Sequence, residues 1–240
     1  MKGALRLIYP PQCMSCDAPV AEEGALCPTC WNEVEFLGNC CCSRCGVPLP
    51  DDGGGDHAGL LCDDCLALPR PWQRGRGALA YRGTGRKLVL MLKHGDRLDL
   101  APALGDWAAR AAAPLVRQGM AVVPVPLHPR RLARRKYNQA ALLSQRVARV
   151  HGLAHLPRAL VRLRHTPMQD HGSADDRFAN LAGALAVRSG QAAALQGRAV
   201  LLVDDVMASG ATLAAATEAL LRAGSGPVSV VVLARAIKDT

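Results

Sequence analysis

The chain has 240 residues and a mass of 25.4 kDa, and half of its residues are hydrophobic. That is enough apolar material for one or two domains with a buried core, and the charged fraction of 20% excludes a disordered chain. No apolar run reaches the roughly 18 residues that a membrane-spanning helix needs, and residues 1–9 contain no stretch typical of a secretory signal. We therefore expect a cytoplasmic protein, whose ten cysteines are metal ligands rather than disulfides.

The net charge of +9 is unevenly distributed along the chain. Residues 1–70 carry four basic and ten acidic side chains, a balance of −6, whereas residues 71–240 carry 25 basic and ten acidic side chains, a balance of +15. All ten cysteines lie in the acidic part, and Pro69-Arg70-Pro71 marks the expected boundary between a cysteine-rich module and a second domain. The surplus of +15 indicates either an anionic partner, such as phosphates or nucleic acid, or a well-solvated surface.

Four Cys-x-x-Cys pairs recur in the acidic module. They are Cys13/Cys16, Cys27/Cys30, Cys42/Cys45 and Cys62/Cys65. Two thiolates at this spacing can bind the same metal ion, and two such pairs complete a tetrahedral four-sulfur site. The pattern therefore predicts two structural zinc ions, with a redox role or incidental thiols as the alternatives. Because the module has few large apolar residues, we expect the metal to supply part of its folding energy.

How the cysteine pairs share two ions stays open from the sequence. The short separation of Cys16 from Cys27 favours two sequential sites, whereas a cross-braced arrangement would join the first pair to the third. Cys40 and Cys41 are additional cysteines. His57 is a possible substitute ligand, although we prefer to interpret it as a solvated histidine in a Gly-rich loop. Four thiolates leave no open coordination position, so both sites are expected to be structural and not catalytic.

The second domain alternates predicted strands with predicted helices. The strands are expected at Gly77–Tyr81, Ala121–Val125, Arg198–Val206 and Val228–Ala234. The helices are expected at Arg86–Lys93, Leu98–Gln118, Asn138–His151 and Ala211–Ala223, the second broken near Pro114 and the last capped by Gly224. Strands that are apolar on both faces and alternate with helices predict an α/β fold with a parallel sheet covered on both sides.

The strand expected at Arg198–Val206 leads through two carboxylates into a loop of small residues. Such residues let backbone N–H groups close around a phosphate, and the start of the next helix adds unpaired donors and the positive end of its dipole. The residues expected to form this cradle are Ala208, Ser209, Gly210, Ala211 and Thr212. Asp204 and Asp205 would repel a phosphate and fit instead as acceptors for two sugar hydroxyls, which predicts a ribose 5-phosphate site. The alternative is an ordinary strand-to-helix turn with a solvated Asp pair. A Walker-type NTPase is disfavoured because there is no Gly-Lys-Ser/Thr element.

The stretch LLVDDVMASGATL at 201–213 resembles the phosphoribosyl pyrophosphate (PRPP) signature of type I phosphoribosyltransferases. The wider pattern resembles the ComF/GntX family of competence-associated proteins, in which a cysteine-rich zinc module precedes a phosphoribosyltransferase-like domain. The other matching segments are LKHGD at 92–96, VPVPLHPRRLARRKYNQA at 123–140, RHTPMQ at 164–169 and VVVLARA at 230–236. Two segments depart from the family pattern: the loop reads Ala-Ser-Gly instead of Thr-Thr-Gly, and Lys136-Tyr137 replaces Gly-Phe or Gly-Tyr.

The resemblance implies a type I phosphoribosyltransferase-like, flavodoxin-like parallel sheet with a small hood and an N-terminal zinc-ribbon module. On this basis residues 1–70 are expected to form the zinc module and residues 71–240 the phosphoribosyltransferase-like domain. PRPP with Mg²⁺ is the implied ligand, and handling of internalised single-stranded DNA in natural competence is the implied role, with a DNA-handling helicase as a further partner. The alternatives are an active phosphoribosyltransferase acting on an unidentified base or amine and a PRPP sensor without chemistry. Catalytic residues stay unassigned.

A site for PRPP needs basic side chains and Mg²⁺ for the pyrophosphate. Lys93, at the end of a predicted helix, is a candidate for this task, or it interacts only with the helix dipole. A basic run could form a mobile loop that closes over pyrophosphate, grip a nucleic acid backbone, or be the solvated start of a helix. The members of this run are Arg130, Arg131, Arg134, Arg135 and Lys136. Asn138 and Gln139 add uncharged donors, and Tyr137 could stack on a base. Four further polar residues match family positions and are expected to brace the loops: Arg164, Gln169, Arg177 and Asn180.

Overall fold

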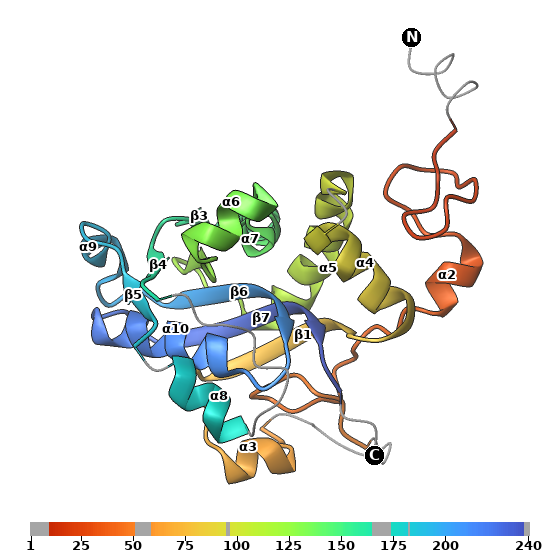
Figure 1. Cartoon of the computed structure of the whole chain (residues 1–240). Coiled ribbons are helices and arrows are strands. Elements are labelled where there is room, and N and C mark those ends of the chain that lie inside the picture. The colour runs from red at the N-terminus through yellow and green to blue at the C-terminus, as the bar shows by residue number, and fades with distance from the viewer. Residues whose placement is uncertain (1–9, 51–58, 95–96, 165–173, 182, 238–240) are drawn as a thin grey trace.

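The computed structural model describes residues 10–50, 59–94, 97–164, 174–181 and 183–237. A five-stranded parallel sheet lies at its centre (Figure 1). The strands are β1 (Arg74–Ala80), β2 (Ala121–Pro124), β3 (Ala154–His155), β6 (Val200–Met207) and β7 (Val228–Arg235). They lie in the order β1-β7-β6-β2-β3, and every neighbouring pair is parallel. The predicted α/β fold with a parallel sheet is therefore confirmed.

Helices cover both faces of this sheet, as parallel strands require. On one face lie α4 (Gly83–His94), α5 (Ala101–Ala112) and α7 (Gln139–His151). On the opposite face lies α10 (Ala211–Arg222). Successive side chains of β6 alternate between the two cores: Leu201 packs with α5 and α7, whereas Leu202 packs with α10. The continuous apolar run of this strand thus reflects burial on both sides.

Two helix ends follow from particular residues. The helical segment expected at 98–118 is divided into η1 (Leu98–Leu100), α5 and η2 (Ala113–Leu115), and it stops just after Pro114. Helix α10 is terminated by Gly224, whose φ of 85° is the left-handed conformation that glycine adopts without strain. There the Ser225 N–H bonds to the Leu220 carbonyl at 3.1 Å, which closes the last turn.

A small subdomain, the hood, stands next to the α10 face. It contains the antiparallel pair β4 (Leu160–Arg162) and β5 (Leu185–Val187), with α8 (Ala174–Leu181) and α9 (Ala192–Leu195). Helix α10 packs against β5 and α8, so the hood is fixed to the core beside the end of β6. The periodicity of the sequence did not predict these elements, because two strands of three residues carry too few side chains for a pattern.

The order of the strands creates a switch point between β2 and β6. Strand β2 leads outward to β3 through α7 on one face, and β6 leads in the opposite direction to β7 through α10 on the other face. Ligands of open α/β sheets bind outside the carboxyl ends of the strands at such a point. The residues after β2 and at the end of β6 are therefore the first candidates for a ligand site.

The cysteine-rich module wraps around the outer edge of β1. Backbone hydrogen bonds join Leu37 N–H to the Ala78 carbonyl at 3.0 Å and Ala80 N–H to the Glu35 carbonyl at 2.8 Å. The first half of the module, with α2 (Pro28–Asn32), lies against α4 and α5, and its Trp31 and Phe36 rings make edge-to-face contacts with Trp107 of α5.

The second half of the module, with α3 (Asp63–Ala67), joins the core on the α10 face. The module is thus packed on the second domain through both of its halves. No helix in the part of the chain that the structure describes is long and apolar enough to cross a bilayer.

Candidate functional site

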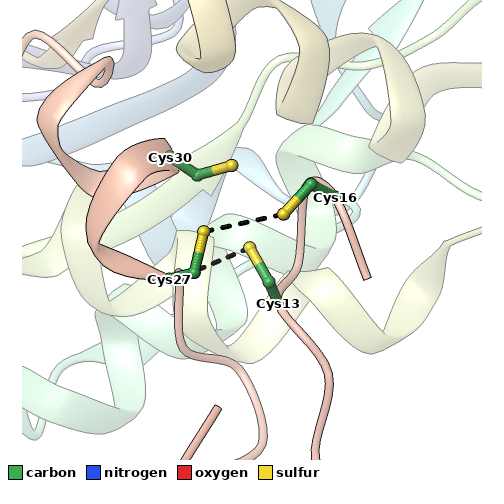
Figure 2. Close-up of side chains that lie close together, drawn as sticks. All are labelled: Cys13, Cys16, Cys27 and Cys30. Carbon is green, nitrogen blue, oxygen red and sulfur yellow. Dashed lines mark hydrogen bonds between the residues drawn. The ribbon is translucent and has the colours of Figure 1, made fainter. Parts of the chain in front are cut away.

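The eight paired cysteines form two clusters. Cys13, Cys16, Cys27 and Cys30 make the first cluster (Figure 2), and Cys42, Cys45, Cys62 and Cys65 make the second. Within each cluster all Sγ atoms lie within 4.8 Å of one another. A Zn–S distance of about 2.3 Å places tetrahedral sulfurs about 3.8 Å apart. The observed separations of 3.6 Å, Cys16 to Cys27 and Cys45 to Cys62, fit that geometry. The donor sets suit structural zinc, and the sequential pairing is the one present.

Both clusters are built in the same way. In each, the first Cys-x-x-Cys lies on a tight turn whose following residue has a positive φ, 62° for Asp17 and 70° for Gly46. In each, the second Cys-x-x-Cys begins a short helix, with Cys27 before α2 and Cys62 before α3. Backbone N–H groups also bond to sulfur, as from Cys27 N–H to Cys13 Sγ at 3.3 Å. Such a turn-and-helix unit holds four thiolates at one point.

The clusters differ in exposure, and the extra cysteines belong to neither. Cys16 of the first cluster is exposed, whereas no residue of the second cluster is. Cys40 donates a hydrogen bond from Sγ to the Leu49 carbonyl at 3.4 Å. Cys41 is buried, and this burial raises the pKa of its thiol. His57, the suggested substitute ligand, lies outside the described residues.

The second candidate site surrounds the aspartate pair near the end of β6. Asp204 and Asp205 are partly buried, and the Asp205 N–H bonds to Asp204 Oδ1 at 2.8 Å. Burial, followed by the neighbouring Asp205 carboxylate, raises the pKa of Asp204 to about 7. Lys93, from the end of α4, places Nζ 3.2 Å from Asp205 Oδ1. The structure thus brings the predicted lysine and the predicted acids together across 112 residues of sequence separation.

The loop after the aspartates is a tight bend at the start of α10. Gly210 has a φ of 84°, which a residue with a Cβ adopts only with strain. An added Cβ there would also lie 3.1 Å from the Trp72 ring. Ser209 Oγ accepts a hydrogen bond from the Ala211 N–H at 3.4 Å, Ala208 is exposed, and Thr212 belongs to the first turn of α10. Unpaired N–H groups at a helix start favour an anion.

The basic run after β2 forms a helix and not the mobile loop considered from sequence. This helix, α6 (Pro129–Arg135), starts at Pro129, and the His128 ring accepts a hydrogen bond from the Arg130 N–H at 3.2 Å. Leu, Ala and Arg are good helix formers, and Lys136 ends the helix with a φ of 64°. Arg130 and Lys136 are exposed, while Arg131 and Arg135 are partly buried. The backbone of Arg134 lies in α6, but its side chain is outside the described part of the structure.

Three residues after α6 brace the site. The Tyr137 hydroxyl donates to the Leu92 carbonyl at 2.6 Å, Asn138 Nδ2 donates to the Val125 carbonyl at 2.9 Å, and Gln139 Nε2 lies 3.5 Å from the Lys93 carbonyl. Asn138 Oδ1 also accepts from the Ala140 N–H at 3.1 Å and so caps α7. These side-chain donors are directed at backbone carbonyls, and Gln139 is fully buried. Their contacts position Lys93 and the end of β2 against α7.

Arg162 of β4 is a site residue that sequence reasoning missed. It is 8% exposed, and its charge acts with Lys93 to lower the pKa of Asp204 against the larger effect of burial. Burial, and then the nearby charge of Arg131, lower the pKa of Arg162 itself. The hood therefore brings Arg162 close to Asp204, and α6 brings Arg131 close to Arg162. The signal available in the sequence was the position of this charged residue next to Leu160 and Val161 in an otherwise apolar segment.

The family-matched residues of the hood are only partly described. Arg164 is exposed, and Asn180 lies partly buried in α8. Gln169 and the side chain of Arg177 lie outside the described residues, as do Gly95 and Asp96 of the LKHGD segment. Their expected bracing role stays a prediction.

Comparison with known proteins finds two family matches in the chain. Residues 4–66 match the double zinc ribbon domain, and residues 171–240 match the phosphoribosyl transferase domain. Among solved structures, a glutamine PRPP amidotransferase from B. subtilis complexed with ADP and GMP is 18% identical, with a TM-score of 0.41. That similarity covers 60% of this chain and 30% of the amidotransferase chain. TT1426 from Thermus thermophilus is 18% identical with a TM-score of 0.37, over 58% of this chain and 85% of the other.

Curated relatives match along almost the full length. Competence protein F of Haemophilus influenzae is 42% identical over 234 residues, which are 94% of this chain and 97% of the relative. DNA utilization protein YhgH is 33% identical in Salmonella typhi and 32% identical in Escherichia coli K12, over 96% of this chain and 100% of each relative. With its double zinc ribbon and its phosphoribosyltransferase domain, the chain belongs to the ComF family of competence protein F and YhgH.

Proposed function

We propose that the chain binds PRPP with Mg²⁺ at the carboxyl ends of β2 and β6 and that it serves in handling internalised single-stranded DNA. One observation supports the binding of PRPP. Asp204 and Asp205 lie close to the cations Lys93 and Arg162, beside a glycine-containing loop at the start of α10. Carboxylates accept hydrogen bonds from a sugar diol, the loop N–H groups suit its 5-phosphate, and the cations suit a pyrophosphate. Each part of PRPP therefore has a chemically matched partner.

The residues present also fit a magnesium complex. Mg²⁺ prefers oxygen ligands and commonly binds through one or two carboxylates together with substrate phosphates. Asp204, Asp205 and the pyrophosphate oxygens of PRPP would supply such ligands, and bound Mg²⁺ would neutralise part of the leaving-group charge. Lys93 and Arg131 would contribute the remaining positive charge near the pyrophosphate. Arg135 and the side chain of Arg134 are further candidates of the basic helix.

Titration calorimetry with Mg-PRPP tests the ligand. We expect the wild type to bind and the Asp204→Asn/Asp205→Asn variant to bind at least about 100-fold more weakly, because two charge-assisted hydrogen bonds are lost. Asp106→Asn is the matched control, since Asp106 forms an ion pair with Arg146 on α5 and α7, away from the loop. Equal affinities in the wild type and the double variant would refute the site. Ribose 5-phosphate and inorganic phosphate titrated in parallel distinguish recognition of the sugar from that of a bare anion.

The role in DNA handling rests on the names of the relatives and on charge. YhgH is named as a DNA utilization protein and its Haemophilus relative as a competence protein. In this chain Arg130 and Lys136, at the two ends of α6, are exposed to solvent. Their charges suit a nucleic acid backbone, and a DNA-handling helicase is the protein partner to examine. Release of pyrophosphate from PRPP across a panel of bases and amines would reveal the alternative, an active phosphoribosyltransferase.

A further inference from the structure

Two arginines hydrogen-bond to backbone carbonyls at the start of the loop 208–212, which we call the phosphate loop. Arg235, at the end of β7, is 5% exposed and donates from Nη1 to the Met207 carbonyl at 3.1 Å and to the Ala208 carbonyl at 2.9 Å. Arg70 donates from Nη1 to the Ser209 carbonyl at 2.8 Å. Three successive carbonyls at the end of β6 and in the bend thus bind guanidinium groups. A loop whose N–H groups are to surround an anion needs its carbonyls turned away in this manner.

The same two arginines reach the second cysteine cluster. Arg235 Nη2 lies 3.8 Å from Cys45 Sγ, and the Arg70 side chain lies beside Cys65. Four thiolates around one Zn²⁺ carry a formal charge of −2, which two guanidinium groups balance. Groups that hydrogen-bond to metal ligands orient them and tune the site. The arginines therefore connect an anionic metal centre with the outside of the phosphate loop.

Trp72 forms a third connection between cluster and loop. Its ring is fully buried, and Nε1 donates to the carbonyl of Arg44, which lies between Cys42 and Cys45, at 2.6 Å. The far edge of the ring lies next to Gly210. The Arg70 guanidinium lies 5.8 Å from the Trp72 ring centre and 5.4 Å from that of Phe178 on α8. The wall between cluster and loop is therefore closely packed around Trp72 and the Arg70 guanidinium.

The first cluster has a different environment. Its half of the module contacts α4 and α5 of the second domain: Lys87 Nζ donates to the Ser15 carbonyl at 2.6 Å, Thr84 Oγ1 donates to Glu33, and the Trp31 ring contacts Trp107. Cys13 and Cys27 bond with their own segment, through the N–H groups of Ser15 and Cys27. Any effect of zinc on the loop at 208–212 should therefore come from the second cluster.

We propose that the second zinc site positions the phosphate loop through Arg70 and Arg235, so that zinc at this site and the phosphoribosyl ligand stabilise each other's binding. The proposal rests on the proposed function for the identity of the ligand, and it goes beyond it in giving the second zinc ribbon a part in ligand binding. Arg70 and Arg235 are positioning residues that act through backbone carbonyls. By linkage, whatever factor zinc contributes to ligand affinity, the ligand contributes to zinc affinity.

The first test measures the loop without ligand. Hydrogen exchange by mass spectrometry compares peptides covering 204–213 in the full-length zinc-loaded protein and in Arg70→Gln and Arg235→Lys. The lysine keeps the charge but cannot reach a sulfur and two carbonyls at once. We expect exchange of the loop amides to rise about tenfold in both variants, the factor that one charge-assisted hydrogen bond supplies. Arg222→Gln, an exposed residue of α10 paired with Glu218, is the control and should leave exchange unchanged. If Arg235→Lys does not fold, loop exchange in Arg70→Gln alone tests whether the arginines hold the loop.

The second test measures zinc retention at each cluster. A zinc chelator and iodoacetamide are added together, and labelling of individual cysteines is followed by mass spectrometry with and without saturating Mg-PRPP. We expect the ligand to slow labelling of Cys62 and Cys65 about tenfold and to leave Cys16 and Cys30 unaffected. Arg70→Gln should abolish this protection. Equal slowing at both clusters would overturn the proposal, because it would mean a general stabilisation of the fold.

The two tests separate the proposal from the function on which it rests. If the wild type binds no PRPP, the proposed function fails, and the ligand-free exchange measurement still decides whether the arginines hold the loop. If PRPP binds but neither arginine variant alters loop exchange relative to Arg222→Gln, the coupling is refuted while the ligand site stands.

Discussion

Lowering the pH is expected to weaken ligand binding through Asp204. Its pKa is raised to about 7 by burial and by Asp205, so the carboxylate that would accept the sugar hydroxyls takes up a proton just below neutral pH. If only the ionised form binds, affinity falls about tenfold per pH unit below 7, and hence about tenfold between pH 8 and pH 6. Calorimetry of Mg-PRPP binding in two buffers of different ionisation enthalpy also reports the proton released on binding.

The same shift predicts the effect of pH on folding. A carboxyl whose pKa is higher in the folded than in the unfolded chain binds more protons when folded, so the free energy of unfolding decreases as pH rises. Between the ordinary value of 3.8 and about 7, Asp204 would contribute a decrease of about 1.4 kcal/mol per pH unit. Asp204→Asn should therefore melt at a higher temperature than the wild type at pH 8 and approach it near pH 4.

The Asn variant is also the control for the ligand, whose phosphates titrate in the same range. Proton release present in the wild type and absent in Asp204→Asn would attribute the effect to this carboxyl. Equal proton release in both proteins, or a wild-type affinity independent of pH between 6 and 8, would refute the reasoning. So would a melting temperature that changes with pH equally in the two proteins.

Three further outcomes are expected. Gly210→Ala should lower the stability by about 1–2 kcal/mol from its positive φ, and more if Trp72 cannot move, which a thermal melt would detect; an unchanged melt contradicts the conformational argument. Metal analysis should find two zinc ions per chain, and a chelator should expose Cys16 to alkylation before the second cluster, none of whose cysteines is exposed; the reverse order contradicts the exposure argument. Arg130→Gln/Lys136→Gln should reduce the dependence of log affinity for single-stranded DNA on log salt by about 1.4, and an unchanged slope in a gel-shift series excludes these contacts.

The sequence predicted the core of the fold because the core obeys simple periodicities. The strands of the parallel sheet are apolar on both faces, so their runs, such as 200–203 and 230–233, are continuous and easily recognised. The hood escaped because β4 and β5 have three residues each and are stabilised by packing on α10. The sequence did not distinguish a loop from a helix at 129–135, because five neighbouring cations repel one another. In the structure the segment is helix α6, capped by His128 at its start and by Lys136 at its end.

The candidate site divides in a similar way. The aspartate pair and the small-residue loop were visible from sequence because their chemistry is local. Lys93 was one of two equal interpretations until the fold brought it to Asp205. Arg162 and Arg235 could not be assigned, because their roles come from contacts between strands that are distant in sequence. A charge within a short strand, or at the end of a fully apolar one, is the signal to use in other chains.

The most direct measurement is a crystal structure of the zinc-loaded protein soaked with Mg-PRPP. We expect density for the 5-phosphate against the backbone of residues 208–212 and for the ribose diol within hydrogen-bonding distance of Asp204 and Asp205. The pyrophosphate should then lie towards Lys93 and Arg131. Ligand density elsewhere on the molecule, or a loop left empty at saturating ligand while both aspartates bond only to protein, would contradict the account.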